Sequence, residues 1–297
     1  MAEIYGIDSG MISGFKPSRP DDGYKNTFGT AVICAGSEFM TGAAVMAAGA
    51  ALRSGAGLVR VFSEERTLNA VSCNEPCALL EKRPESTTQL LRKAASLCAK
   101  AGSVLIGSGK PGDYADMEAL TEVFLAKAGN IVLDAGAFPV KPDVLSRFKE
   151  RLKARNVPAV ITPHIGEFAR LTGLSNTEVL SDAQGLASGF ASENNCITVL
   201  KSSKTIVATP DGKIFINDVP NSGLAKGGSG DILAGLIAGL LAQGMEPYKA
   251  ACSAVFIHSM AGQICAGDLG KRAMLPTDLE FYVKDAYIEA GWEDDDE

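Results

Sequence analysis

Histidine is nearly absent from this 297-residue sequence, which contains only His164 and His258. The seven cysteines are an odd number, and no two of them are spaced as Cys-x-x-Cys. Structural zinc sites are built mainly from closely spaced Cys and His, so the sequence excludes the common ones. Several cysteines lie in apolar runs, and we expect them to be reduced and packed as small hydrophobic residues.

An excess of positive charge is also lacking. The net charge is −7, and five of the negative charges lie in residues 293–297, which leaves −2 for the rest of the chain. Non-specific nucleic-acid binding needs a basic surface that neutralises phosphates, so nucleic acid is not an expected partner. The acidic end is typical of a solvated tail, which we place at residues 291–297.

No hydrophobic run suits a membrane span. The longest uncharged stretch, residues 250–267, contains the polar residues Ser253, His258, Ser259 and Gln263. We therefore expect a buried helix there, with His258 as a core histidine. The N-terminus does not show the basic and then apolar pattern of a secretory signal. These features predict a cytoplasmic protein with no membrane partner.

Aromatic residues make up only 6% of a sequence that is 46% hydrophobic, so small aliphatic residues must form the core. From residue 30 onward, short Val/Ile/Leu-rich runs alternate with longer Ala/Leu-rich segments. This alternation predicts an α/β fold whose central, mostly parallel sheet is covered by helices on both faces. We expect strands at 31–35, 58–62, 104–106, 131–134, 159–162 and 197–201, and helices at 41–53, 87–100, 115–128, 142–153 and 181–193.

The pattern changes near residue 204. Residues 204–208 and 213–216 flank a Pro-Asp-Gly turn and predict a β-hairpin, which would place antiparallel strands at one edge of the sheet. Helices near 230–243, 247–266 and 277–290 would follow it. Residues 1–24 show weak periodicity, so we expect an irregular lead-in and then one domain over residues 25–290.

Residues 221–231, NSGLAKGGSGD, are the strongest local motif and lead into an apolar helix. Glycines expose successive backbone N–H groups, and the start of a helix adds its positive dipole end, so the loop suits a phosphate. Asp231 would lie in the first helical turn, where a carboxylate can take the proton of an attacking hydroxyl. A simple glycine-rich turn with Asp231 at the helix start is the alternative interpretation.

Other segments follow predicted strands at the edge of the sheet where ligands bind in such folds. Residues 107–112, GSGKPG, would form a glycine turn that lines a pocket, and residues 201–205, KSSKT, could hold a nucleotide or form a plain turn. His164, at a predicted strand-to-helix junction, could contact a ligand or simply cap the helix. The Ala/Gly-rich segment 41–57 would let another helix or a ligand approach closely.

Four motifs in this order resemble one known family. They are Lys25-x-x-x-Gly29, the segment from Ala35-Gly36-Ser37 to Gly57-Leu58-Val59, the sequence TPHIGE at 162–167, and the sequence GLAKGGSGD at 223–231. This family is the ADP/ATP-dependent NAD(P)H-hydrate dehydratases, a branch of the ribokinase-like superfamily. The resemblance covers residues 25–290.

The resemblance implies a repair enzyme. Members restore (6S)-NAD(P)H hydrate to NAD(P)H by phosphorylating the C6 hydroxyl, after which phosphate leaves and the ring double bond forms. ADP or ATP would be the phosphoryl donor, with Mg²⁺, and homo-oligomers, commonly tetramers, are expected. The N-terminal epimerase domain of some relatives does not occur here, so a separate epimerase would be required.

The resemblance also assigns roles to individual residues. Asp231 matches the catalytic base and a contact to the hydrate, and Gly228, Ser229 and Gly230 match the anion hole. The other assigned positions are Ala43, Gly109 and His164 for the hydrated dinucleotide, and Lys201, Ser202, Ser203, Lys204, Thr205 and Gly230 for the adenine nucleotide. No protein metal ligand is assigned.

The sequence departs from the family pattern at five positions. Ser229 replaces the usual Thr but keeps its hydroxyl group. Elsewhere, Ser108 and Ile165 replace common prolines, Ser202 replaces a common Gly, and Gly136 replaces a second acidic residue. The change at Gly136 could alter binding of the metal or the substrate.

Two other functions remain open from the residues alone. A ribokinase-like kinase acting on a vitamin precursor or sugar alcohol would use the same glycine loop and Asp231. A binding module or NAD(P)-dependent oxidoreductase would use residues 107–112. That segment lacks the context of a dinucleotide fingerprint, because Pro111 interrupts the turn and Asp134 follows Gly107 by 27 residues instead of about 20.

Overall fold

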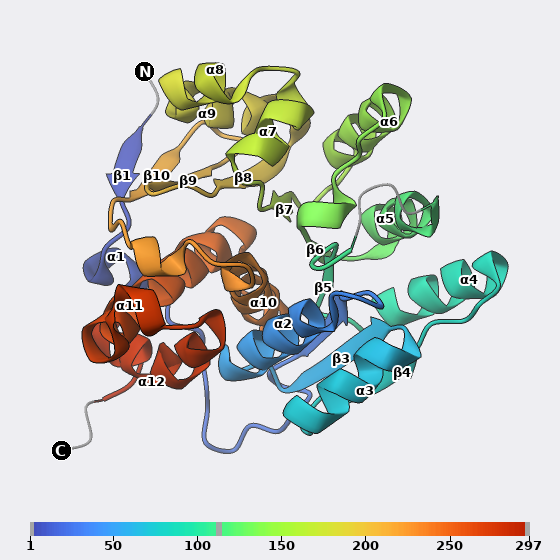
Figure 1. Cartoon of the computed structure of the whole chain (residues 1–297), viewed down its shortest axis with the longest axis horizontal. Coiled ribbons are helices and arrows are strands. Elements are labelled where there is room, and N and C mark those ends of the chain that lie inside the picture. The colour runs from blue at the N-terminus through green and yellow to red at the C-terminus, as the bar shows by residue number, and fades with distance from the viewer. Residues whose placement is uncertain (1–2, 111–114, 295–297) are drawn as a thin grey trace.

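A ten-stranded β-sheet forms the centre of the computed structural model, which describes residues 3–110 and 115–294 (Figure 1). The strand order is β1-β10-β9-β8-β7-β6-β5-β2-β3-β4. The strands are β1 (Ile4–Gly6), β2 (Thr30–Cys34), β3 (Leu58–Ser63), β4 (Leu79–Lys82), β5 (Ser103–Ile106), β6 (Asn130–Leu133), β7 (Ala159–Ile161), β8 (Cys196–Leu200), β9 (Thr205–Ala208) and β10 (Ile214–Asn217).

Only β9 runs against its neighbours among the described strands. It pairs antiparallel with β8 and with β10, whereas every other strand pair in the sheet is parallel. The predicted α/β fold and the predicted hairpin near one edge of the sheet are therefore confirmed.

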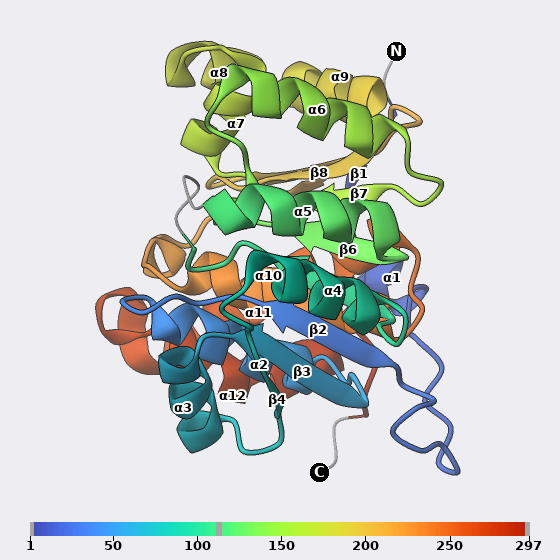
Figure 2. The same ribbon diagram turned by 90° about the vertical axis from the view of Figure 1, so that its right-hand side faces the viewer.

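Helices cover both faces of the sheet. They are α1 (Ser9–Ser13), α2 (Thr41–Arg53), α3 (Glu65–Asn74), α4 (Thr87–Cys98), α5 (Ala115–Lys127), α6 (Pro142–Lys153), α7 (Ile165–Thr172), α8 (Asn176–Ser181), α9 (Ala183–Asn194), α10 (Ser229–Ala242), α11 (Pro247–Ala273) and α12 (Leu279–Glu289). The helices α4, α5 and α6 lie side by side on the face turned toward the viewer in Figure 2.

The sheet separates two hydrophobic cores. Alternate residues of β2 show this division, because Ile33 packs into one core and Val32 into the other. The core that contains Ile33 is formed with α2, α10 and α11, and the core that contains Val32 is formed with α4 to α9. A sheet buried on both faces explains the nearly continuous apolar runs of its central strands.

Both ends of the chain differ from the predictions. Residues 1–24 are not an irregular lead-in, because β1 extends the sheet beside β10 and α1 follows it. The indole of Trp292, inside the predicted tail 291–297, is buried and donates a hydrogen bond of 2.8 Å to the Ile12 carbonyl. The domain therefore extends past both predicted boundaries. Residues 1–2 and 295–297 lie outside the described part of the chain.

Two elements were also missed between residues 64 and 82. Strand β4 lies at the sheet edge with Leu79 and Leu80 exposed, so it lacks the buried apolar run that marks the inner strands. Helix α3 precedes it and buries Leu68 and Val71. Edge elements of this kind carry a weak hydrophobic pattern, which explains why sequence periodicity did not indicate them.

Helix α11 is long and apolar enough to cross a membrane by length and composition alone. In its most apolar 18-residue window, however, 72% of the residues are buried inside the protein. The residue Cys252 of this helix, for example, packs in the core beside α10 and α12. This agrees with the buried helix predicted for residues 250–267.

Small residues bring α2 and α10 into unusually close contact. A Cβ atom added to Gly235 of α10 would lie only 2.3 Å from the Ala47 carbonyl oxygen of α2. One turn later, a Cβ on Gly239 would lie 2.7 Å from the Ala51 carbonyl oxygen. The backbones can approach so closely only because these positions lack side chains. Over Ala47–Ala51, the Ala/Gly-rich segment therefore serves helix packing, because α10 lies directly against it.

We expect Gly235→Ala to destabilise the protein by about 1–3 kcal/mol, as overpacking of a well-filled core does. The matched control is Gly189→Ala in α9, where a new Cβ would meet nothing within 4 Å. That exposed helical position should gain stability of about 0.5–1 kcal/mol, since Ala has the higher helix propensity. Denaturant unfolding of both variants measures these changes. Equal effects at the two positions would contradict the close approach of α2 and α10.

Candidate active site

A buried polar cluster lies where the central strands end. Asp134 directly follows β6, and its carboxylate is 3% exposed. One of its oxygens accepts hydrogen bonds from Thr162 Oγ1 at 2.8 Å and from Lys201 Nζ at 2.9 Å, and the other accepts one from Ser108 Oγ at 2.9 Å. The three donors follow β5, β7 and β8, so four neighbouring parallel strands build this cluster at their carboxyl ends.

The glycine loop reaches the same edge through α10. Gly228 is the N-cap of α10 with φ of +107°, a conformation that favours glycine. The amides of Gly230 and Asp231 have no carbonyl partner among the described residues. A Cβ on Gly230 would lie 3.1 Å from Lys201 Nζ, so the ammonium group is directly beside the first turn of the helix. The predicted anion hole and Lys201 therefore meet.

Asp231 stands in this first turn as a carboxylate with no ion pair among the described side chains. Burial raises its pKa to about 7, and the nearby Asp134 charge adds to this rise, while Lys201 and the Ser108 hydroxyl oppose it. A general base works best when its pKa is near the working pH. Asp231 is thus tuned to accept a proton from a hydroxyl placed over the glycine loop.

His258 of α11 is largely buried and hydrogen-bonded, as predicted, and it lies beside the loop. Its Nε2 is 3.0 Å from the Ser229 carbonyl oxygen and 3.1 Å from Ser229 Oγ. Burial lowers its pKa to about 4, so the ring is neutral and Nε2 can donate to the carbonyl oxygen. The Ser229 Oγ accepts a hydrogen bond from the same His258 N–H, so the hydrogen of the Ser229 hydroxyl stays available for an anion in the loop. His258 therefore positions Ser229.

The residues predicted to contact the hydrate gather at this edge as well. A Cβ on Gly109 would lie 2.3 Å from the Ala43 Cβ, so the β5 turn rests on the first turn of α2. Ser37 Oγ fixes that turn by donating to the Gly109 carbonyl at 2.9 Å. Since Ser108 of the same turn influences the pKa of Asp231, the turn and the carboxylate are close together.

His164 caps α7, which is the structural alternative raised from its sequence context. Its Nδ1 accepts the N–H groups of Gly166 and Glu167, and the Glu167 carboxylate accepts the His164 N–H in return. The imidazole remains 59% exposed at the edge of the site. Its Nε2 lies 3.3 Å from the other Glu167 carboxylate oxygen, so both ring nitrogens face partners within the capping turn, and an exposed face of the ring is what remains for a ligand.

The loop 201–205 divides into two parts. Lys201 turns inward to Asp134, whereas Ser202, Ser203 and Lys204 are exposed. Lys204 pairs with Asp218 at 2.7 Å on the surface. The sequence motif did not distinguish these two environments.

The chain is similar to known proteins in both sequence and structure. Residues 31–284 match the family model described as NAD(P)H-hydrate dehydratase. The ADP-dependent (S)-NAD(P)H-hydrate dehydratase of Bacillus subtilis is 32% identical over 89% of this chain and 90% of its own length. A crystal structure of the ADP/ATP-dependent NAD(P)H-hydrate dehydratase from B. subtilis, co-crystallised with ATP/Mg²⁺, superposes with a TM-score of 0.86 over 96% of this chain and 98% of that one, at 28% identity.

The chain belongs to the NAD(P)H-hydrate dehydratase family. It also matches bifunctional NAD(P)H-hydrate repair enzymes, such as that of Moorella thermoacetica, at 33% identity over 89% of this chain. The chain spans about half the length of those bifunctional relatives. The ribokinase-like fold implied by the sequence motifs is thereby confirmed.

Two departures from the dehydratase family pattern have structural explanations. Ser108, in place of a common proline, supplies the hydroxyl that hydrogen-bonds Asp134. At Gly136, a Cβ would lie 2.0 Å from the Lys110 carbonyl oxygen, so this backbone accepts no second acidic side chain there. The residues described include no cluster of three His, Cys, Asp or Glu suited to a metal ion.

Asp134, Thr162 and His258 join this site although they were not among the predicted site residues. Asp134 and Thr162 are the last residues of predicted strands, and a polar side chain at a strand end is a signal that could have found them. His258 carried no such signal, because only the packing of α11 on α10 brings it to Ser229.

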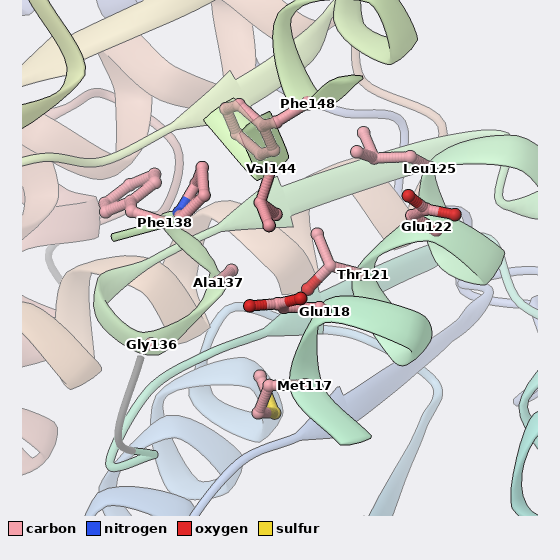
Figure 3. Close-up of a pocket in the computed structure, with 11 residues that line it drawn as sticks. Met117, Glu118, Thr121, Glu122, Leu125, Gly136, Ala137, Phe138, Val144 and Phe148 are labelled. Carbon is pink, nitrogen blue, oxygen red and sulfur yellow. The ribbon is translucent and has the colours of Figure 1, made fainter. Parts of the chain in front are cut away.

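A separate small pocket lies between α5, α6 and the 3-10 turn Ala135–Ala137 (Figure 3). Its walls are largely apolar, as Met117, Phe138 and Phe148 show. The Thr121 hydroxyl is buried there without a hydrogen-bond partner among the described residues. None of the predicted site residues lines this pocket, so the pocket and the candidate active site are different places.

We expect Asp231→Asn to raise Tm at pH 8.5 by about 2–4 °C, which corresponds to roughly 1 kcal/mol for a domain of this size. The native pKa of Asp231, about 7, exceeds its ordinary value of 3.8, so the folded state binds the proton more tightly. Folding stability therefore falls as pH rises from about 4 through 7, and Asn removes this penalty. At pH 4 the variant should match the original protein. Equal Tm shifts at both pH values would show that Asp231 does not titrate in this way.

Proposed function

We propose that the protein converts (6S)-NAD(P)H hydrate to NAD(P)H with ADP or ATP as phosphoryl donor. The observation that carries the proposal is the meeting of Asp231, with a pKa of about 7, and the open amides of the glycine loop beside Lys201. This is an anion site and a base adjacent to one another. Hydroxyl phosphorylation requires both.

The reaction has two stages. In the first, Asp231 takes the proton of the C6 hydroxyl while its oxygen bonds to the terminal phosphorus of the nucleotide, and the bond from that phosphorus to the bridging oxygen breaks. In the second, the C6–O bond breaks and inorganic phosphate leaves. A proton is lost from C5 as the C5–C6 double bond forms. The leaving phosphate takes up one of the two protons, so the sum is hydrate plus ATP giving NAD(P)H, ADP, phosphate and a proton, with AMP in place of ADP when ADP is the donor.

Ligand contacts are assigned by position. Ala43 and Gly109 lie against each other at this edge, and His164 lies beside Lys201; these three residues would hold the hydrated dinucleotide. The exposed part of the loop 201–205 and Gly230 would hold the adenine nucleotide. The support for this assignment is that both groups border the Asp134 cluster, because the Gly109 turn carries Ser108 and His164 pairs with Lys201 through a β-bridge.

Mg²⁺ would arrive with the nucleotide. Both Asp134 oxygens already accept hydrogen bonds, and the described residues lack a carboxylate cluster, so the chain fits a cation held mainly by phosphate oxygens. Magnesium commonly binds through one or two carboxylates and substrate phosphates. Bound in this way, the ion would supply charge neutralisation to the phosphoryl group.

The proposal extends to the location, the partner enzyme and the oligomeric state of the protein. A cytoplasmic location suits a chain whose seven cysteines are all free thiols, five of them buried. An epimerase that interconverts the R and S hydrates is the partner activity we propose, since the similar proteins include bifunctional NAD(P)H-hydrate repair enzymes. We also propose that the protein forms a homo-oligomer, such as a tetramer, which light scattering would detect.

A small-molecule kinase is the second candidate, since the glycine loop and Asp231 serve its reaction equally well. The two functions differ in what leaves the enzyme. A kinase releases a stable phosphorylated alcohol, whereas the dehydratase releases inorganic phosphate and a reduced nicotinamide.

The experiment supplies chemically hydrated NADH, ADP or ATP, and Mg²⁺, and follows the absorbance of NADH. We expect recovery that depends on nucleotide. Asp231→Asn should lower turnover by about 10²–10⁴, the usual contribution of a general base, while nucleotide binding measured by calorimetry persists. Absence of NADH recovery with either nucleotide would refute the proposed activity.

A further inference from the structure

Lys201 occupies an electrostatically unusual position. Its ammonium nitrogen lies beside Gly230, at the positive end of the α10 dipole, where a cation is normally disfavoured. Burial by itself would lower the pKa of Lys201, yet Asp134 and Glu167 outweigh this and leave the pKa raised. The carboxylates therefore keep the ammonium charged, and its ion pair with Asp134 holds it beside the open amides of Gly230 and Asp231. An anion that enters the loop would meet the ammonium and these amides together.

We propose that Lys201 is a catalytic residue that binds the transferred phosphoryl group inside the anion hole, and that Asp134 is a positioning residue that holds its ammonium there. This inference rests on the proposed function and deepens it. It separates Lys201 from Ser202, Ser203 and Lys204, whose exposed positions suit contacts to the rest of the nucleotide.

Asp134 is suited to positioning and not to proton transfer. Thr162 and Lys201 share one of its oxygens and Ser108 takes the other, so its carboxylate is held in one orientation. A fixed, ionised Asp134 aims the ammonium at the helix start. Its charge also opposes that of Asp231, which keeps the base able to accept a proton.

During transfer, Lys201 forms no covalent bond. The substrate oxygen loses its proton to Asp231 and bonds to phosphorus, and the bridging oxygen departs with the nucleotide. Negative charge accumulates on the phosphoryl oxygens as this happens. The ammonium and the Gly230 and Asp231 amides stabilise that charge more in the transition state than in the bound nucleotide, so Lys201 should act on kcat.

The first test compares Lys201→Met and Lys201→Arg in the hydrate assay. Loss of the ammonium should lower kcat by about 10²–10³, as loss of one oxyanion donor does, with a change in nucleotide KM of less than about threefold. Arginine should restore part of the rate, because it keeps the charge. Lys213→Met is the matched control, since Lys213 is an exposed lysine paired with Asp211 on the β9–β10 hairpin, and it should leave both constants unchanged.

Lys201→Met leaves Asp134 buried without its cationic partner, which destabilises the fold. The second test separates this destabilisation from the loss of the ammonium group. The double variant Asp134→Asn/Lys201→Met removes both charges of the buried Asp134–Lys201 ion pair and should regain the Tm of the original protein. If Lys201 had only a structural role, the kcat of the double variant would recover together with its Tm. We expect kcat to stay low, and recovery would overturn the proposal.

The pH profile gives an independent readout. The charged groups facing Asp231 are Asp134, Lys201 and, through Lys201, Glu167, while His258 stays neutral beside Ser229. Asp134→Asn should move the acid limb of kcat/KM downward by about one pH unit and Lys201→Met should move it upward, because each removes a charge near the base. If the acid limb of the kcat/KM profile moves in neither variant, the proposal is overturned. Activity of the unaltered enzyme tests the proposed function separately.

Discussion

The close approach of α10 to α2 is the constraint on which the site depends. Gly235 and Gly239 let the backbone of α10 lie against Ala47 and Ala51, and this contact directs the N-terminus of α10 to the edge of the sheet. A larger residue at either glycine would push the helix outward and carry the anion hole away from the strand ends. The geometry of the phosphate site is therefore decided two turns away from the residues that would touch phosphate.

The second organising feature is the arrangement of charge where the strands end. Asp134, Lys201 and Asp231 lie close together in a partly desolvated place, and the charge of Asp134 raises the pKa of both Lys201 and Asp231. Asp134 is saturated with hydrogen bonds and Asp231 is not paired, so the two carboxylates differ in function although their chemistry is the same. The hydrogen bonds of Asp134 suit the positioning role that we propose for it, and burial raises the pKa of Asp231, the proposed base, to about 7.

Much of this was open to prediction from the sequence. The inner strands, the hairpin and the glycine loop carry strong local signals, since a strand buried on both faces needs a continuous apolar run and a phosphate loop needs glycines. The helices from α4 to α6 began at or next to the predicted residues for the same reason. Strand β1 and strand β4 were missed because edge strands are short and exposed, and Trp292 because a single buried aromatic residue leaves no periodic pattern.

By itself, the sequence determined that Asp231 would start a helix behind exposed amides, because glycine spacing and helix periodicity are local properties. Only the tertiary structure decided which distant side chains surround it. Ser108, Asp134 and Lys201 come together because parallel strands end at one edge, and His258 reaches Ser229 because α11 packs on α10. Burial and neighbouring charges then set the pKa of Asp231, and these are quantities that no short segment of the chain contains.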